Sequence, residues 1–222
     1  MEIKIESTVK GTRILCLDTA NRKRDLINYM INFCRKKGFN EIMLPAIQFQ
    51  QTFSGKVGGE NQKMMYNFKD PGGRDLCLAP EYTAVIQELS KTTFKFQKNV
   101  KLFYIQECFR GEKPQAGRYR QFTQFGVEII NPDEKLDLGV YKDLASFASS
   151  LIGLGLDSVS EERIVEFEIN RDATRGLDYY KEGKGFEIVC ETLGAQKQIC
   201  GGGEYEGGIG FAVGVDRLML LK

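Results

Sequence analysis

The stretch of sequence richest in chemically useful side chains is residues 108–128, CFRGEKPQAGRYRQFTQFGVE. Arg110 stands at the end of one apolar run, a loop rich in glycine, proline and charge follows, and the return run alternates polar and aromatic side chains. A guanidinium group can bind phosphate and an aromatic ring can stack on a base, so this pattern suits a nucleotide. A solvated basic hairpin would have the same composition, and the residues alone leave both interpretations open.

The chain contains no histidine among its 222 residues. This excludes a Ser/His/Asp or Cys/His nucleophilic site, an HExxH zinc site and general-base catalysis by imidazole. The 31 basic and 30 acidic residues give a formal net charge of +1. Because a dedicated nucleic-acid-binding protein usually carries a strong positive field, any contact with a polyanion must here be local.

The six cysteines are widely spaced, form no CxxC pair and stand mostly among apolar residues. We therefore expect buried free thiols and a reducing, cytoplasmic compartment. The first residues, MEIKIE, lack the apolar core of a signal peptide, and no segment approaches the roughly 18 apolar residues of a membrane span. No membrane association is expected.

The elements that must position these residues follow from the spacing of apolar side chains. Helical spacing predicts helices over Thr19–Lys37, from Pro80 to about Ser90, and over Lys135–Ile152. Strand patterns cover Glu41–Leu44, Met64–Phe68, Asp75–Leu78, Val100–Phe109, Arg120–Ile130, Arg163–Asn170, Gly185–Glu191 and Gln196–Cys200, and Ile209–Lys222 is a strand end followed by a short helix. Strands paired through turns, with helices outside strict βαβ alternation, predict an α+β fold on an antiparallel sheet. Without visible repeats or linkers, we expect a single domain over residues 1–222.

Several blocks of the sequence resemble class II aminoacyl-tRNA synthetases, and the histidyl type in particular. Residues 108–128 are similar to motif 2, residues 173–180 (ATRGLDYY) to a segment characteristic of the histidyl family, and residues 210–218 (GFAVGVDRL) to motif 3. Shorter matches occur in the expected order at Pro45, at residues 79–83 (APEYT) and at residues 200–207 (CGGGEYEG). The resemblance covers most of the chain from residue 38 onward and implies the class II synthetase fold, an antiparallel sheet flanked by helices.

The resemblance also assigns roles to residues. Arg110 and Arg175 would be catalytic, because both would neutralise charge on the α-phosphate of ATP. ATP would be bound by Arg110, Glu112 on the adenine side, Arg118 at the terminal phosphates, Phe122 stacked on adenine, and Arg217 at the γ-phosphate and adenine. The amino acid would be bound by Glu81, Thr83, Gln124, Glu128, Tyr179, Tyr180 and Tyr205.

The substrate implied by these matches is histidine. Glu81, Thr83 and Gln124 match the family positions around the α-amino group. Glu128 and Tyr180 match those that hold the imidazole ring, whose two nitrogens a carboxylate and a phenol can bind.

The implied reaction is activation of histidine with ATP to histidyl-adenylate, with Mg²⁺ as a further cofactor and no metal ligands assigned to the protein. The substrate carboxylate is already the nucleophile, so the reaction needs no enzymic histidine. The aminoacyl group would pass to the acceptor end of tRNA or to another acceptor. Class II cores pair through the motif 1 region, so we expect a homodimer in which the apolar face of the first helix packs against the partner.

The sequence departs from the family pattern at several positions. Arginine is replaced by Ala79, Lys113 and Glu204, histidine by Thr123 and aspartate by Glu206, and the segment from Tyr180 to Phe186 is one residue longer than expected. Only 46 residues separate Glu128 from Arg175, too few for the helical insertion domain of the family, and an anticodon-binding domain is expected to be missing after motif 3. Two alternatives therefore stay open: a non-catalytic paralogue acting as a regulatory or binding subunit, and the excised catalytic domain of a larger synthetase.

Overall fold

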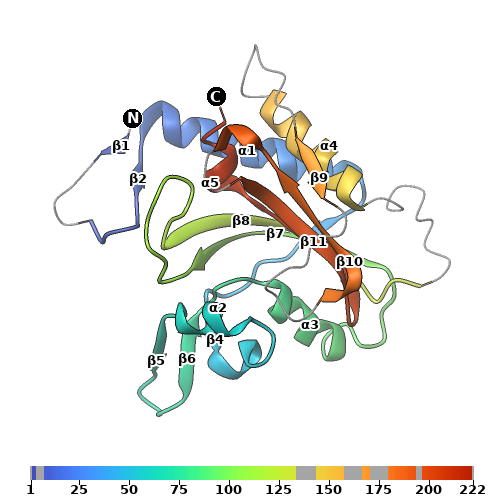
Figure 1. Ribbon diagram of the computed structural model, residues 1–222. Helices are drawn as coiled ribbons and strands as arrows, with labels where there is room; N and C mark the ends of the chain where they lie inside the picture. Colours follow the sequence, from blue (N-terminus) through green and yellow to red (C-terminus); the bar gives the residue numbers. More distant parts are fainter. Residues whose placement is uncertain are drawn as a thin grey trace.

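The computed structural model describes residues 2–3, 8–133, 144–157, 167–170, 180–193 and 197–221, and its main sheet has seven strands (Figure 1). Their order is β3-β7-β8-β12-β11-β10-β9. The strands are β3 (Asn40–Glu41), β7 (Val100–Phe109), β8 (Gln121–Ile130), β9 (Glu168–Asn170), β10 (Tyr180–Val189), β11 (Gln198–Tyr205) and β12 (Gly208–Gly214). Every neighbouring pair is antiparallel except β3 and β7. The predicted α+β fold on an antiparallel sheet is confirmed.

One face of the sheet is covered by α1 (Leu17–Lys36) and α4 (Leu144–Asp157) (Figure 1). Phe125, Val127 and Ile129 of β8 are buried in the core beneath these helices. Side chains alternate along a strand, so the even-numbered residues of β8 lie on the opposite face. Gln124 and Glu128 of β8 are thereby kept out of the helical core.

The opposite side carries α3 (Thr83–Lys91) and a smaller sheet of order β4-β6-β5. Its strands are β4 (Ile47–Phe49), β5 (Asn67–Lys69) and β6 (Asp75–Leu78). A second core cluster, which includes Phe53, Tyr82 and Tyr104, joins these elements to the main sheet. The remaining short elements are β1 (Glu2–Ile3), β2 (Ile14–Leu15), η1 (Gln50–Phe53), α2 (Gly59–Lys63), η2 (Glu191–Leu193) and α5 (Val215–Leu218).

Two element boundaries near the N-terminal half differ from the sequence predictions. The strand predicted over Glu41–Leu44 is wrong, because β3 ends at Glu41 and β4 lies beyond Pro45. The helix predicted from Pro80 begins only at Thr83. Its first amides, those of Thr83 and Ala84, donate to the Glu81 carboxylate at 2.7 and 3.0 Å, so Glu81 caps the helix.

Two elements in the C-terminal half extend further than predicted. The helix predicted to stop at Ile152 continues to Asp157, because Gly155 packs closely against α1: a Cβ there would lie 2.9 Å from Cδ1 of Leu26. Strand β11 likewise continues through the glycines after Cys200 to Tyr205. Residues 134–143, 158–166 and 171–179 lie outside the described residues, and with them parts of the helix and strand predicted there.

The structure also corrects the expected role of the first helix. Leu26, Ile27, Met30 and Cys34 form the apolar face of α1, and all four are buried in the chain's own core. That face is therefore not available to a partner subunit. All six cysteines are free thiols, as expected, and five of them are buried. None of the helices in the described part of the chain is long and apolar enough to cross a membrane.

Candidate active site

A cavity of about 230 Å³ opens on the face of the main sheet opposite α1 and α4. Eleven of the thirteen predicted site residues are described, and nine of them line this cavity: Glu81, Thr83, Arg110, Glu112, Arg118, Phe122, Gln124, Tyr180 and Arg217. The other two, Glu128 and Tyr205, lie directly behind its wall. Arg175 and Tyr179 lie outside the described residues. Segments from four parts of the chain thus converge on one space.

The floor of the cavity is formed by residues with little or no side chain. Gly201 of β11 pairs with Ala212 of β12, and Gly214 pairs with Gln124 of β8. Gly201, Ala212 and Gly214 all line the cavity. A flat group can therefore lie close to the backbone of the sheet, which larger residues would prevent.

One end of the cavity is cationic and begins at Arg110, just beyond the end of β7. Its Nε donates to the carbonyl oxygen of Pro80 at 2.8 Å. Its guanidinium carbon lies 5.1 Å from the centroid of the Phe122 ring. Neither terminal amino group of Arg110 bonds to any described residue. The hydrogen bond from Nε fixes the guanidinium group of Arg110, and its two terminal amino groups can then donate to a phosphate oxygen.

The same end contains two further arginines from different motifs. Arg118 forms an ion pair with Glu112 across the loop between β7 and β8. Arg217, in α5, donates from Nε to the carbonyl of Gly117 at 2.9 Å and from Nη1 to the carbonyl of Gln198. Arg217 thus links the loop to the edge of β11, and Glu112 holds Arg118 beside the cavity.

The other end of the cavity lies in front of a buried carboxylate, Glu128, which is 1% exposed. Its Oε2 accepts a hydrogen bond from the hydroxyl of Tyr205 at 2.8 Å, and its Oε1 accepts one from Thr83 at 3.3 Å. Gly210 stands opposite Glu128 on β12, and a Cβ at that position would lie only 1.6 Å from Oε2. The glycine of motif 3 therefore makes room for the carboxylate.

Electrostatics at this end are unusual because no lysine or arginine pairs with Glu128 among the described residues. Burial raises the pKa of Glu128 well above its ordinary value, and the nearby Glu81 acts in the same direction, while the Tyr205 and Thr83 hydroxyls oppose both. Burial also raises the pKa of Tyr205 well above its ordinary value, and Glu128 adds to that rise. An uncompensated buried carboxylate favours a ligand that donates protons or carries positive charge.

The other described residues that are predicted to bind the amino acid surround this carboxylate. Thr83 connects Glu128 to the N-terminus of α3, which Glu81 caps. The amide oxygen of Gln124 accepts a hydrogen bond from the buried thiol of Cys108 at 3.3 Å. The Tyr180 ring packs edge-on against Tyr205, with centroids 6.5 Å apart. The register between β10 and β11 is irregular from Tyr180 to Gly185, where the segment one residue longer than expected is accommodated.

Sequence reasoning missed several polar residues that line the cavity: Tyr119, Glu187, Gln198 and Asp216. Asp216 could have been predicted, because it lies inside the motif 3 block and next to Arg217, which was assigned to ATP. For Glu187 the only indication in the sequence was the alternation of side chains along β10. Tyr119 and Gln198 had none, because their place depends on the fold of a loop and on strand pairing.

Carboxylates that line the cavity are the side chains that could bind Mg²⁺ there. Glu81 is bound by backbone amides, Glu112 by Arg118, and Asp216 by Arg13 and Lys23. No group of three Cys, Asp or Glu residues suited to a metal exists among the described residues. Because these three carboxylates are already bound, a Mg²⁺ ion would fit here together with the phosphate oxygens of a bound nucleotide.

Comparison with known proteins bears on the identity of this cavity. The family model described as Histidyl-tRNA synthetase matches residues 11–159, more than half of the chain. The chain belongs to the histidyl-tRNA synthetase family. The histidine--tRNA ligase of Methanosarcina acetivorans is 32% identical over 307 aligned positions, which include 95% of this chain and 74% of that protein. The alignment exceeds 222 positions because that relative carries residues without a counterpart here.

Solved structures agree with the family assignment. The apo histidyl-tRNA synthetase of S. aureus has a TM-score of 0.68 and 26% identity, and the match covers 98% of this chain and 69% of that chain. A Bacillus halodurans protein described as ATP phosphoribosyltransferase regulatory subunit/histidyl-tRNA synthetase has a TM-score of 0.73 at 15% identity, covering 98% and 84%. At that identity the second likeness shows the fold alone.

Proposed function

We propose that this chain activates histidine with ATP to form histidyl-adenylate, and then transfers the histidyl group to tRNA or another acceptor. A single observation carries the proposal: one cavity has three arginines at one end and, at the other, a buried carboxylate for which no described residue provides a cationic partner. The first end suits a triphosphate, and the second suits a proton-donating side chain. The family membership of the chain supports the same reaction.

In this reaction a carboxylate oxygen of histidine attacks the α-phosphorus of ATP, and the bond to the β-phosphate oxygen breaks with release of pyrophosphate. Arg110 is proposed to bind the α-phosphate, where its Pro80 contact fixes the guanidinium beside Phe122. Arg175 is proposed to act with it, from its place in the histidyl-type segment. Arginines held in place before the reaction stabilise developing charge without reorganisation. Adenylate formation therefore proceeds without a general base.

The other ATP contacts follow from the same end. Phe122 is proposed to stack on adenine, Arg217 to contact the γ-phosphate and adenine, and Arg118 to bind the terminal phosphates after leaving Glu112, which would then face adenine. Bound with the nucleotide, Mg²⁺ supplies charge neutralisation on the phosphates.

Histidine is the proposed amino acid because its ring nitrogens match the groups behind the cavity wall. Glu128 and Tyr180 are proposed to bind the ring, and Tyr205 holds Glu128 in place. Glu81, Thr83 and Gln124, with Tyr179, complete the proposed amino-acid site. An apolar side chain of similar size would leave the buried carboxylate unpaired and should be rejected strongly.

The second candidate function, a non-catalytic regulatory subunit, is favoured by the likeness of the fold to the B. halodurans protein. Loss of catalysis would release the ATP-binding arginines from selection. Arg110, Arg118 and Arg217 instead all line the cavity, and Arg110 is held in a geometry suited to phosphate. The catalytic proposal therefore has the stronger support.

Amino-acid-dependent ATP–pyrophosphate exchange with each of the twenty amino acids tests this proposal. We expect exchange with histidine and little with the other nineteen. Exchange with a different amino acid would overturn the specificity, whereas binding of histidine without any exchange would favour the regulatory function.

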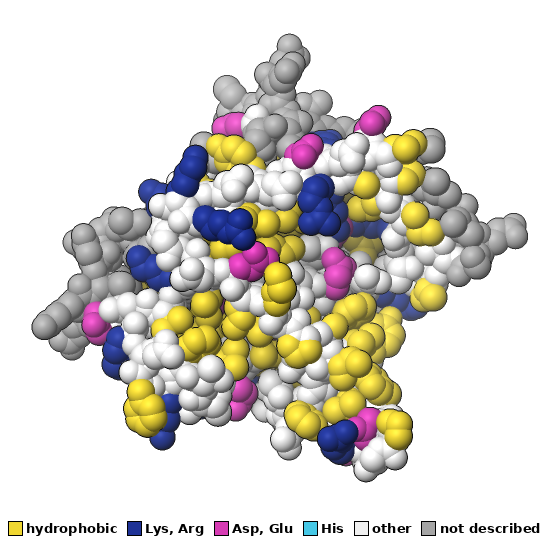
Figure 2. Space-filling model, turned by 180° about the vertical axis from the view of Figure 1, so that it is seen from behind, with side chains coloured by type: hydrophobic (Ala, Val, Ile, Leu, Met, Phe, Trp, Pro, Cys, Tyr) yellow, Lys and Arg dark blue, Asp and Glu magenta, His cyan; other side chains and the backbone are white. Residues whose placement is uncertain are grey.

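A homodimer is proposed as the assembly, on a different surface from the one expected. Four large apolar side chains on or beside the smaller sheet are exposed: Met43 (82%), Ile47 (54%), Phe49 (48%) and Phe68 (39%). Figure 2 shows hydrophobic side chains gathered over the lower half of one face of the molecule. Contiguous exposed apolar surface of this kind marks association sites. Light scattering should give a dimer mass that Phe49→Lys reduces to that of a monomer.

A further inference from the structure

Two segments far apart in sequence meet at the rim of the cavity. They are residues 11–13, before α1, and the loop formed by residues 111–120. The amide of Arg120 donates to the carbonyl of Gly11 at 2.8 Å. Gly11 has φ +89°, and a Cβ there would lie 2.7 Å from Cγ of Arg120 and 2.9 Å from Cγ of Pro114. The N-terminal segment is thus in close backbone contact with the loop.

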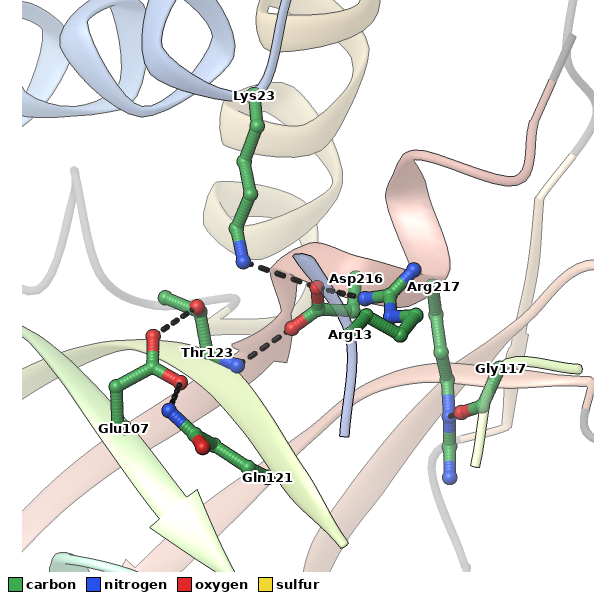
Figure 3. A network of polar contacts seen from close by, with 8 residues as sticks. All are labelled: Arg13, Lys23, Glu107, Gly117, Gln121, Thr123, Asp216 and Arg217. Atoms are coloured by element: carbon green, nitrogen blue, oxygen red, sulfur yellow. Dashed lines mark hydrogen bonds and ion pairs between the residues drawn. The ribbon is translucent and has the colours of Figure 1, made fainter. Parts of the chain in front are cut away.

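Arg13 extends this contact into the cavity wall. Its guanidinium carbon lies 3.5 Å from the centroid of the Tyr119 ring. Its Nη2 forms an ion pair with Oδ1 of Asp216, at the start of α5 (Figure 3). The Arg13 side chain is only 13% exposed and that of Asp216 only 4%. A stacked, largely desolvated guanidinium fixes both the ring and the carboxylate that it touches.

Asp216 is in turn bound from two other directions. The amide of Thr123, on β8, donates to Oδ2, and Nζ of Lys23, on α1, lies 2.9 Å from Oδ1 (Figure 3). The adjacent Arg217 holds the loop at Gly117. The loop that carries Arg118 is therefore held from α5 at two points, directly through Arg217 and indirectly through Arg13 and Tyr119.

We propose that Arg13 is a positioning residue of the nucleotide site, which fixes Tyr119, and with it the loop carrying Arg118, against Asp216. The proposal rests on the proposed function, since it assigns the loop to ATP. Arg13 itself does not line the cavity and acts through Tyr119. Its loss should weaken ATP binding and leave the histidine end unchanged.

A purely structural role would be to neutralise Asp216, and the chain contains a matched control for it. Lys23 binds the same oxygen of Asp216 but has no contact with Tyr119. Lys23→Ala and Arg13→Ala each remove one positive charge beside Asp216. Arg13→Lys keeps the charge and loses the planar group that stacks. If Arg13 positions Tyr119, both Arg13 variants should differ from Lys23→Ala. If Arg13 only neutralises Asp216, Arg13→Ala and Lys23→Ala should behave alike.

The first measurement is the exchange kinetics of these three variants. We expect both Arg13 variants to raise the KM for ATP about tenfold, since a buried stacking contact of this kind is worth on the order of one tenfold step. The KM for histidine should stay unchanged, and Lys23→Ala should leave both constants unchanged. Equal effects of Arg13→Ala and Lys23→Ala would overturn the proposal.

The second measurement needs no activity: amide hydrogen exchange of residues 111–120 in the ligand-free protein. Both Arg13 variants should speed exchange in this loop, and Lys23→Ala should not. An unchanged loop in a folded Arg13→Ala protein overturns the positioning role. A wild-type chain without ATP–pyrophosphate exchange would instead contradict the proposed function, and hydrogen exchange would still decide the role of Arg13.

Discussion

The two ends of the cavity are built on different physical principles. At the proposed ATP end, partly exposed arginines donate to backbone carbonyls and to the Glu112 carboxylate. At the amino-acid end, a fully buried carboxylate is held by two hydroxyls, with no described cation beside it. The first end can adjust to a large, flexible triphosphate. The second is preformed, and its buried carboxyl group selects the ligand.

This difference also separates what sequence could predict from what it could not. Arg110 and Arg118 stand in a block of glycine, proline and charge that suited a nucleotide or a solvated basic hairpin, whereas Arg217 was assigned only through the family resemblance. Glu128 stands in an apolar strand, and only the resemblance to a family marked it. Its setting depends on Gly210, Tyr205 and Thr83, which come from three other elements. Long-range packing of this kind leaves no local pattern.

The fold shows a similar division. The strands Val100–Phe109 and Asp75–Leu78 were predicted with the correct bounds, because their apolar patterns are long or bounded by clear turns. The helix predicted to end at Ile152 and the strand predicted to end at Cys200 both continue further, since the sequence does not show where a glycine permits close packing inside an element. The Arg13 contact with Tyr119 had no sequence signal at all.

Removing Arg110 should give the largest effect. Arg110→Ala should lower the rate of histidine-dependent exchange by roughly 10² or more, because a fixed donor to the α-phosphate is lost. Binding of histidine, measured by calorimetry, should be retained. Lys69→Ala, which removes only an exposed pair with Asp75, serves as the control. Equal loss of histidine binding in Arg110→Ala would remove the distinction between the two ends.

Glu128→Gln should act on the opposite end. The amide keeps the shape and a hydrogen bond to Tyr205 but cannot give up a proton and become negatively charged beside the bound ring, so histidine activation should weaken by about 10- to 100-fold. The KM for ATP should stay within about a factor of two of wild type, because the nucleotide end is untouched. A variant with normal histidine kinetics would exclude Glu128 from recognition.

Two buried tyrosines on this side provide a matched pair. The hydroxyl of Tyr205 donates to Glu128, whereas the buried hydroxyl of Tyr104 has no partner among the described residues. Tyr205→Phe should destabilise the fold by about 1–3 kcal/mol and impair histidine activation, since the carboxylate loses a donor. Tyr104→Phe should be neutral or slightly stabilising. Urea denaturation compares them, and similar losses in both would refute the role of Tyr205.

The raised pKa of Glu128 predicts a pH-dependent stability. Between the ordinary carboxyl pKa and the raised value, the folded protein holds a proton that the unfolded chain has lost. The free energy of unfolding should therefore fall as pH rises, by up to about 1.4 kcal/mol per pH unit from this group. Glu128→Gln should remove that component and become more stable than wild type at neutral pH. Parallel stability curves from pH 5 to 7 would show that Glu128 does not titrate in this way.

The most direct test of the two-ended site is steady-state ATP–pyrophosphate exchange with histidine and ATP each varied, in wild type, Glu128→Gln and Arg118→Ala. We predict that the wild-type chain exchanges with histidine, that Glu128→Gln changes only the constants for histidine, and that Arg118→Ala changes only those for ATP. No exchange with histidine in wild type, or the same shift of both substrates in both variants, would contradict the account.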